Sequence, residues 1–377
     1  ALALHCKINQ EMYFDRKNYY YPDLPKGYQI TQARTPIGVD GYVTIECAGQ
    51  EKKIRIHDIH MEEDTAKSIH QGKHSYLDFN RAGVPLLEIV TEADMKSSEE
   101  AILYLEKLRE LLLYTDVSDC KMEEGSMRCD VNVSISKTET LGTRTEIKNI
   151  GSVRNVGLAI DAESKRQEEV LEQGGVIQEE TRRFDEQLNQ TILMRVKEVG
   201  NDYRYFPEPD IPKLRIDDTR IEQVKKTLPM LPDERRKVYQ DKGILAINSK
   251  KLIQNKPLSD FFNTLLDEDI DFVVASNLLL GDVSAYLNKS SQTLDQTTLS
   301  KERFLLLLDR LKKGVITNKI IKDILEDFLT TTTGIEELME QKGIKNMNDA
   351  SLLIEIIKNI IEQNPDSVKD YQEGKDR

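Results

Sequence analysis

KMEEGSMRCDVNVSISKTETLGTRTEIKN, residues 121–149, contains two runs in which polar and apolar side chains alternate. The first run is Arg128–Ile135 and the second is Thr143–Asn149. Alternation with a period of two is typical of a strand with one buried face. If the two strands pair through a turn near Gly142, their polar faces coincide. The stretch therefore predicts part of a sheet with one charged face.

The charged face allows two interpretations. Charges of both signs suit a site for a phosphorylated, metal-bound ligand, but they also suit a solvated face with cross-strand ion pairs. On this stretch alone we favour the solvated face, because half-solvated antiparallel sheets are common. The side chains concerned are Arg128, Asp130, Asn132, Glu146 and Lys148, with Glu123 and Glu124 at the mouth of the face.

Composition excludes several classes of protein. The formal net charge of −13 over 377 residues means that the overall field does not attract nucleic acid, so such a partner needs a local basic patch or another subunit. The four cysteines form no CxxC pair, which indicates a reducing cytoplasm and neither a zinc ribbon nor a disulfide framework. No apolar run is long enough to span a bilayer. Neither a GxxxxGK[ST] phosphate loop nor a GxGxxG turn is present.

The order of the predicted elements indicates an α+β protein. Residues 1–230 are expected to form a cradle domain with a mixed or antiparallel sheet. Two helices interrupt it: one begins at the capping box of Ser97 and Glu100, and the other covers residues 153–173. The charged residues 163–169 of the second helix are predicted to form a solvated face. An all-α domain at 231–293 and an α-helical tail at 294–377 are expected to follow, joined by a polar linker at 288–300.

Two acidic features are candidate metal ligands. The run His60–Asp64 places adjacent carboxylates beside a histidine, and such groups repel one another unless a cation neutralises them. On a regular strand Glu62 and Glu63 face opposite ways, so at most one contacts a given ion. Glu88 lies among apolar residues, where an unpaired carboxylate is costly to bury. An exposed acidic loop and an edge facing water remain the alternatives.

Two tyrosine-rich segments combine aromatic and charged residues. They are DRKNYYYPD at 15–23 and DYRYFPEPD at 202–210. Such mixtures can stack on a nucleotide base, or they can form an ordinary strand edge and a connection.

Seven long, ordered motifs resemble the B subunit of the bacterial and organellar tRNA-dependent amidotransferases. They are FDRKNYYYPDLPKGYQITQ (14–32), HMEEDTAKS (60–68), DFNRAGVPLLEIVTEADM (78–95), KMEEGSMRCDVNVSI (121–135), TEIKNIGS (145–152), ETRRFDE (180–186) and YRYFPEPDIP (203–212). The archaeal E subunit carries an inserted domain before its helical region. No insertion interrupts residues 205–232 here, which favours the B subunit.

The resemblance implies one subunit of a heterotrimer. A glutaminase A subunit releases ammonia, a small C subunit completes the complex, and the B subunit uses ATP and Mg²⁺ to phosphorylate the side-chain carboxylate of Glu-tRNA(Gln) or Asp-tRNA(Asn). Ammonia then displaces the phosphate. A cytoplasmic location follows for a bacterial protein, and an organellar one stays open. The chain is expected to be truncated at both ends, with further metal ligands on a strand before Ala1.

The resemblance also implies residue roles. Glu63 and Glu88, with Glu62, would hold Mg²⁺, and Lys67 and Ser68 would meet a phosphate. The sheet face would line the pocket for ATP and acyl-tRNA, with Glu123, Glu124, Arg128, Glu146 and Lys148 as catalytic candidates and Asp130 and Asn132 as cofactor ligands. The tail would contact tRNA through Lys312, Lys313, Lys319 and Lys322. The competing hypotheses are a non-catalytic adaptor and a metal-dependent phosphoesterase; dependence of ATP turnover on this chain distinguishes the adaptor from the ligase subunit.

Overall fold

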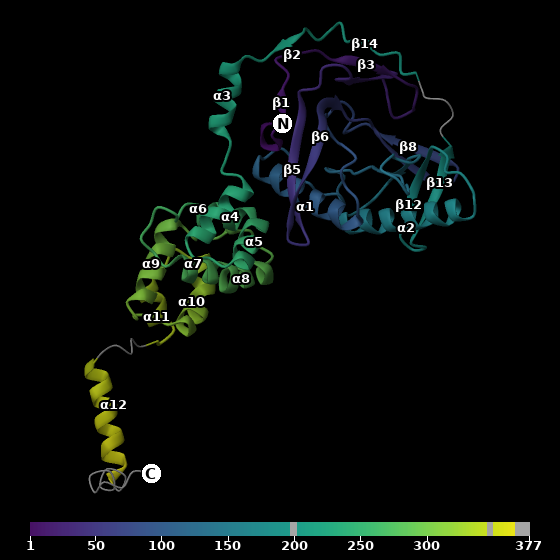
Figure 1. Ribbon diagram of the computed structural model, residues 1–377. Coiled ribbons are helices and arrows are strands. Elements are labelled where there is room, and N and C mark those ends of the chain that lie inside the picture. Colours follow the sequence, from purple (N-terminus) through teal and green to yellow (C-terminus); the bar gives the residue numbers. More distant parts are fainter. Residues whose placement is uncertain (197–201, 345–349, 366–377) are drawn as a thin grey trace. The chain divides into compact units, whose positions relative to one another are not determined.

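The structure is a computed structural model that describes residues 1–196, 202–344 and 350–365. The chain divides into two compact units, Ala1–Pro232 and Asp233–Arg377 (Figure 1). Among the described residues, every strand lies in the first unit and the elements of the second unit are helical. The predicted α+β class is therefore confirmed.

The first unit is built around a long antiparallel hairpin. Strands β5 (Gly38–Cys47) and β6 (Gln50–Glu63) pair along their length. In β6, Ile54 and Ile56 are buried while Lys53 and Arg55 are exposed, as strand alternation requires. An irregularity in the pairing with β9 between Ile56 and Asp58 interrupts this alternation, so that the next buried isoleucine is Ile59. The sheet order is β1-β5-β6-β9, with β1 at Lys7–Ile8 and β9 at Pro85–Thr91.

A second, mixed sheet contains the two runs that alternate in the sequence. Its order is β10-β11-β12-β13. β10 and β11 pair antiparallel, as predicted, with Asn132 opposite Glu146. β11 and β12 are parallel, and helix α2 is the crossover between them. The bounds are β10 Val131–Val133, β11 Thr145–Lys148, α2 Val153–Glu172, β12 Glu180–Asp185 and β13 Gln190–Val196.

Helices α1 (Ser98–Tyr114) and α2 pack against each other along one side of the sheets (Figure 1). The Ser97 side chain caps α1 as predicted, accepting a hydrogen bond from the Glu100 backbone at 3.1 Å. The other half of the predicted capping box is not formed, because the Glu100 carboxylate accepts from the Lys96 backbone N–H at 2.6 Å. The apolar face of α1 and the inner faces of β5, β6, β10 and β11 share one hydrophobic core. This core holds the two sheets in place beneath the polar faces described below.

Short strands join segments that are distant in sequence. Residues 206–215 run beside the N-terminal residues, because β14 (Phe206–Pro207) pairs with β3 (Asp15–Asn18) and β15 (Leu214–Arg215) pairs with β2 (Glu11–Met12). β4 (Tyr28–Thr31) extends the first of these pairs. A separate exposed hairpin consists of β7 (Lys67–Gln71) and β8 (His74–Asp78).

The second unit is helical, and most of its helices are short and pack around a core of leucine, isoleucine and phenylalanine side chains. The division predicted within it, at residue 293, stays a prediction. Helix α3 (Asp218–Thr227) precedes the unit. The helices are α4 Pro232–Asp241, α5 Ala246–Gln254, α6 Lys256–Asn263, α7 Phe272–Leu278, the π-helical η2 Leu279–Val283, α8 Ser284–Ser290, α9 Lys301–Lys312, α10 Asn318–Thr330, α11 Ile335–Gln341 and α12 Ala350–Gln363.

Three local predictions are wrong. The strand expected at 128–135 is reduced to Val131–Val133, because the Ile135 backbone N–H bonds the Gln167 side chain instead of a strand partner. The expected linker at 288–300 contains a 3₁₀ turn, η3 (Leu294–Gln296), with Leu294 buried. Glu163, expected on a solvated helix face, is fully buried among hydrogen-bond donors.

Candidate active site

A cavity of about 3250 Å³ lies in the first unit. It is lined by the ends of β6 and β9, by β10 and β11, and by the loop of residues 117–126. Every site residue predicted above lines it except Ser68, which is exposed on β7. The predicted side chains that do line it are Glu62, Glu63, Lys67, Glu88, Glu123, Glu124, Arg128, Asp130, Asn132, Glu146 and Lys148.

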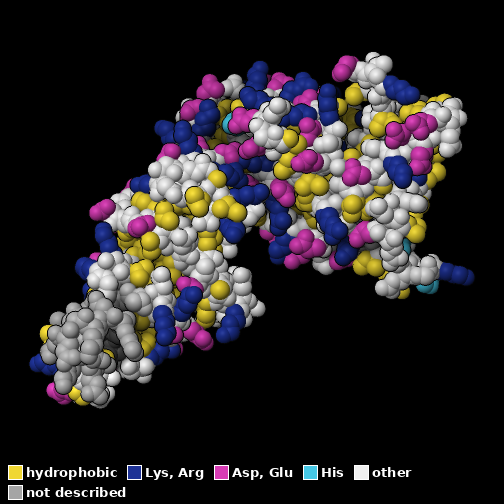
Figure 2. All heavy atoms as spheres, turned by 60° about the horizontal axis from the view of Figure 1, so that its bottom comes forward, with side chains coloured by type: hydrophobic (Ala, Val, Ile, Leu, Met, Phe, Trp, Pro, Cys, Tyr) yellow, Lys and Arg dark blue, Asp and Glu magenta, His cyan; other side chains and the backbone are white. Residues whose placement is uncertain are grey.

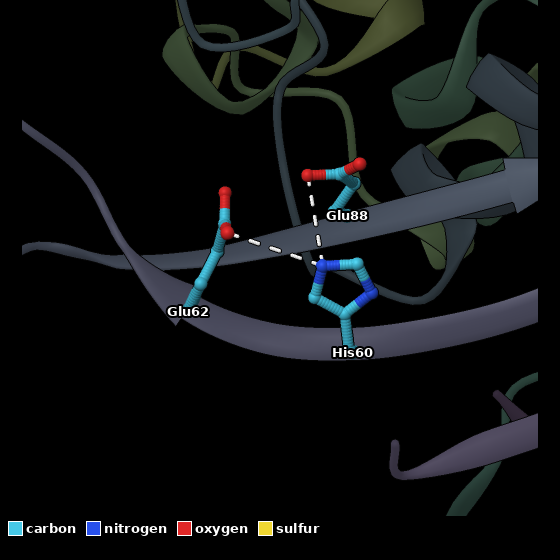
Figure 3. A group of neighbouring side chains, drawn as sticks. All are labelled: His60, Glu62 and Glu88. Atoms are coloured by element: carbon cyan, nitrogen blue, oxygen red, sulfur yellow. Dashed lines mark ion pairs between the residues drawn. The ribbon is translucent and has the colours of Figure 1, made fainter. Parts of the chain in front are cut away.

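One wall carries a group of three potential metal ligands. His60 and Glu62 are two residues apart on β6 and share a face, and the register places His60 opposite Glu88 on β9 (Figure 3). The imidazole Nε2 lies 3.6 Å from a Glu88 carboxylate oxygen and 3.9 Å from one of Glu62. One ligand atom from each residue lies within 4.8 Å of the other two.

The electrostatics of this group show that it requires positive charge. Burial and the nearby Glu88 carboxylate raise the pKa of Glu62, whose side chain is only 8% exposed. Burial alone would lower the pKa of His60, but hydrogen bonds with Asp58 and Glu88 outweigh it and raise this pKa to about 9. The hydrogen bond with His60 lowers the pKa of Glu88. An imidazolium therefore balances the two carboxylates, at the position where a divalent cation would do the same.

Glu63 lies outside this group. It points to the other face of β6, where its carboxylate pairs with Lys26 and accepts a hydrogen bond from the Ile30 backbone at 3.0 Å. The resemblance implied that Glu63 and Glu88 lie together, but the structure brings Glu88 together with His60 and Glu62. Alternation along β6 is the reason, and it was visible in the sequence, whereas which of the two faces meets Glu88 depends on the register with β9.

The β10–β11 face forms an adjacent wall. The Lys148 ammonium lies 2.6 Å from Asp130 and 3.1 Å from Glu146, and the Thr181 hydroxyl donates to Glu146 at 3.1 Å. Arg128 reaches Asp64 at 2.5 Å, which connects the two walls. The ion pairing expected of a solvated face is therefore present: the Lys148 side chain is 34% exposed and that of Asp130 is 49% exposed, and both line the cavity.

The remaining predicted residues lie at the rim. Glu123 and Glu124 are exposed on the loop that precedes β10, and Glu124 pairs with Lys121 at 2.9 Å. Lys67 is exposed at the start of β7.

Sequence reasoning did not single out two residues that lie at the candidate site: His60, a potential metal ligand, and Lys17, a cation. Lys17 lines the cavity, and its ammonium lies 4.9 Å from the ring centroid of Tyr203 and 5.8 Å from that of Tyr19. Among the described residues, no carboxylate lies within ion-pair distance of it. The sequence shows both tyrosine-rich segments, but nothing in it indicates that they meet.

The two segments are held together by a buried ion pair. Arg16 donates two hydrogen bonds to Glu208, at 2.6 and 2.9 Å, and Glu208 is 4% exposed. Asn18 adds bonds to the Tyr203 and Arg204 carbonyls at 3.2 and 2.9 Å. Lys17 lies between these two anchors, so its position at the cavity is fixed.

The donor set fits a hard divalent cation. Two carboxylates beside nucleotide phosphates and water are the usual ligands of Mg²⁺, and the imidazole of His60 can lose its proton when a cation takes over its charge. As for membranes, each helix in the described part of the chain is too short or too polar to cross one.

Comparisons with known proteins agree with this geometry. A family model described as the GatB/GatE catalytic domain matches residues 1–222, and one described as the GatB domain matches residues 260–377. The match thus places the chain in the GatB/GatE class, and the cavity lies in the part of the chain that the catalytic-domain model covers. The B subunits of the aspartyl/glutamyl-tRNA(Asn/Gln) amidotransferases are 46% identical in Bacillus velezensis and 47% identical in Enterococcus faecalis; each match covers 100% of this chain and 80% of the relative. The chain belongs to the family of amidotransferase B subunits.

Proposed function

We propose that this chain is the subunit that activates the side-chain carboxylate of misacylated tRNA, so that Glu-tRNA(Gln) and Asp-tRNA(Asn) become Gln-tRNA(Gln) and Asn-tRNA(Asn). The observation that carries the proposal is 46% identity over the whole chain to B subunits whose name states these substrates. The family uses ATP and works as a multi-subunit enzyme. For this chain we propose ATP and Mg²⁺ as cofactors, with a glutaminase A subunit and a small C subunit as partners.

The reaction requires two transfers at one place. A carboxylate oxygen of the aminoacyl group attacks the γ-phosphorus of ATP, and ADP leaves. Ammonia from the partner subunit then attacks the acyl carbon and inorganic phosphate leaves. Two of the ammonia protons stay on the amide, and the third goes to the leaving phosphate. Both transfers depend mainly on holding the reactants in line and on balancing the phosphate charge.

The cationic side chains of the cavity differ in whether a carboxylate already pairs with them. Lys17 has no carboxylate partner among the described residues and is oriented by two tyrosine rings, so it is the best candidate for a phosphate contact. Lys148 and Arg128 are already paired with Asp130, Glu146 and Asp64. We assign these two to ordering the pocket wall against which the acyl end of the tRNA lies.

His60, Glu62 and Glu88 would hold Mg²⁺. When bound there, the ion would neutralise charge on the nucleotide phosphates. The protein's own part is to keep the two carboxylates ionised and in place, through the register of β6 with β9 and the contact of Asp58 with His60 at 2.7 Å.

The test uses the heterotrimer reconstituted with its A and C subunits and carrying Glu88→Gln. Amidation of Glu-tRNA(Gln) and tRNA-dependent ATP hydrolysis should fall at least about 100-fold, because the variant removes one anionic ligand of the proposed ion. Glutamine hydrolysis, which belongs to the partner, should persist. Glu51→Gln is the matched control, since Glu51 is exposed at the far end of β6 and does not line the cavity.

The possible outcomes separate the hypotheses. Normal amidation by Glu88→Gln would contradict the role of this carboxylate. ATP hydrolysis that does not depend on this chain would favour a non-catalytic adaptor. Hydrolysis of simple phosphate esters without tRNA would favour a phosphoesterase.

A further inference from the structure

A buried polar network lies behind the cavity wall, on the side of the β10–β13 sheet that faces α2. Glu163 and Gln167, one turn apart on α2, are both 0% exposed. They face the buried side chain of Thr145 on β11, whereas Glu146, the next residue, lines the cavity. The proposed chemistry uses none of these buried groups, although buried polar side chains are costly unless they are fully bonded.

The Gln167 amide takes the place of a strand partner. Its Nε2 donates to the Val133 carbonyl at 3.1 Å, and its Oε1 accepts from the Ile135 backbone N–H at 3.1 Å. The ladder between β10 and β11 ends at Val133, so the side chain continues the hydrogen bonding of β10 at the residue where its strand pairing stops.

Glu163 fixes the orientation of that amide. The Gln167 Nε2 also donates to the Glu163 carboxylate at 2.9 Å, which leaves only Oε1 for the Ile135 N–H. Glu163 in turn accepts from Arg166 and from the Thr191 hydroxyl, each at 2.6 Å. Every group here has its partner, so the amide has one favourable arrangement.

The ETRRFDE motif supports the same arrangement from the sheet. Arg182 donates to the Thr191 hydroxyl at 2.9 Å and to Glu180 at 2.8 Å. Its neighbour Thr181 points to the cavity side and donates to Glu146. The motif thus connects the buried network to a side chain of the cavity wall.

We propose that Gln167 is a positioning residue for carboxylate activation. β10 has only three ladder residues, and its central residue, Asn132, lies opposite Glu146. Asp130, which pairs with Lys148, comes directly before the strand. The bonds from Gln167 hold β10 at the distance and register that these contacts require. The inference rests on the proposed function, because it assigns Gln167 to the same reaction.

The test compares Gln167→Met with wild type in the reconstituted heterotrimer. Methionine has a similar length and removes both backbone bonds. The kcat of amidation should fall on the order of 10-fold to 100-fold, while KM for Glu-tRNA(Gln) stays within about twofold, because the variant misplaces reacting groups without removing tRNA contacts. Glutamine hydrolysis should be unchanged. Hydrogen exchange of the Ile135 amide should speed up locally.

The control is Gln173→Met, the same substitution at an exposed position just after α2. Thr145→Val removes one acceptor of Gln167 with little change of shape, and it should lower kcat less than Gln167→Met does. If Gln167→Met does not assemble, the kcat of Thr145→Val tests the inference instead. An unchanged kcat would overturn the inference. The inference would also be overturned if Gln167→Met lost glutamine hydrolysis together with amidation and if amide exchange became faster throughout the chain, because this would mark a general structural defect. A wild-type complex that cannot amidate would instead contradict the proposed function.

Discussion

Glu62 and Glu63 are adjacent in sequence and have opposite surroundings. Glu62 faces His60 and Glu88, and burial raises its pKa, whereas Glu63 is paired with Lys26 and bonded by the β4 backbone. A carboxylate whose ionisation is disfavoured gains most from a cation. A carboxylate already neutralised by a lysine gains little and instead contributes to stability.

The two positions should therefore differ when each is changed to glutamine. We expect Glu62→Gln to weaken Mg²⁺ binding to the heterotrimer at least about 10-fold, measured by titration calorimetry. Glu63→Gln should leave Mg²⁺ affinity within about twofold and lower the melting temperature instead, because it removes the charge of a partly buried carboxylate that pairs with Lys26 and accepts from the Ile30 backbone N–H. Stronger loss of Mg²⁺ affinity from Glu63→Gln than from Glu62→Gln would return the ligand role to Glu63.

At the residue scale, the period-two alternation of a strand is the main feature from which the sequence predicts the surroundings of a side chain. Alternation placed Glu62 and Glu63 on opposite faces, and the apolar surroundings of Glu88 marked it as needing a partner. Periodicity does not reveal register, so the choice of face depended on the pairing of β6 with β9. His60 and Lys17 were missed because their roles arise from contacts with residues distant in sequence.

At the scale of elements, α2 shows where pattern analysis fails. Its sequence from 163 to 169 is rich in charge, which is typical of a solvated face, and yet Glu163 is fully buried where the helix packs on the sheet. The partners that make this burial possible, Arg182 and Thr191, come from β12 and β13. By contrast, the starts of α1 and α2 were predictable, because Ser97 and Ser152 cap them through local hydrogen bonds.

The buried carboxylate predicts a pH-dependent stability. Burial alone would raise the pKa of Glu163, but hydrogen bonds from Arg166, Thr191 and Gln167 lower it overall. A lowered pKa in the folded state means that the ionised group stabilises the fold above its unfolded pKa of about 4.3, and that this contribution is lost as the pH falls below that value.

Glu163→Gln should therefore reduce the free energy of unfolding at pH 7 by about 3 kcal/mol, because it removes the buried charge that pairs with two partly buried arginines, Arg166 and Arg182. The deficit should shrink as the pH falls below about 4.3 and vanish only below the lowered pKa of folded Glu163, where wild type also loses the charge. Urea unfolding at both pH values measures this. Glu169→Gln, at an exposed position on the same helix, should change stability by less than about 0.5 kcal/mol. A deficit that is independent of pH would show that the charge of Glu163 contributes nothing.

At the scale of the whole molecule, charge limits how tRNA can bind. The chain has 66 acidic against 53 basic residues, and Figure 2 shows both kinds interspersed on the face that it presents. Attraction of a polyanion must therefore come from a few basic side chains that are not already neutralised. Where such side chains lie in the helical unit can be judged from their neighbours.

The four tail lysines predicted from the sequence are all exposed but are not equivalent. Lys313 pairs with Asp309 at 2.9 Å, and Lys322 lies 3.8 Å from Asp282. Within the described part of the chain, no carboxylate lies within ion-pair distance of Lys312 or Lys319. These two lysines, at the end of α9 and the start of α10, can bind phosphate without first breaking an ion pair.

We therefore expect the double variant Lys312→Gln with Lys319→Gln to reduce the slope of log affinity for tRNA against log salt concentration by about 2, close to one unit per lost phosphate contact. The matched variant Lys313→Gln with Lys322→Gln removes the same charge and should reduce the slope by less than about 1, since both lysines already have acidic neighbours. Filter binding of the heterotrimer across a salt series measures both. Equal slopes for wild type and the first variant would place the tRNA contact elsewhere, and a larger change in the second variant would show that ion pairing does not determine which lysines bind tRNA.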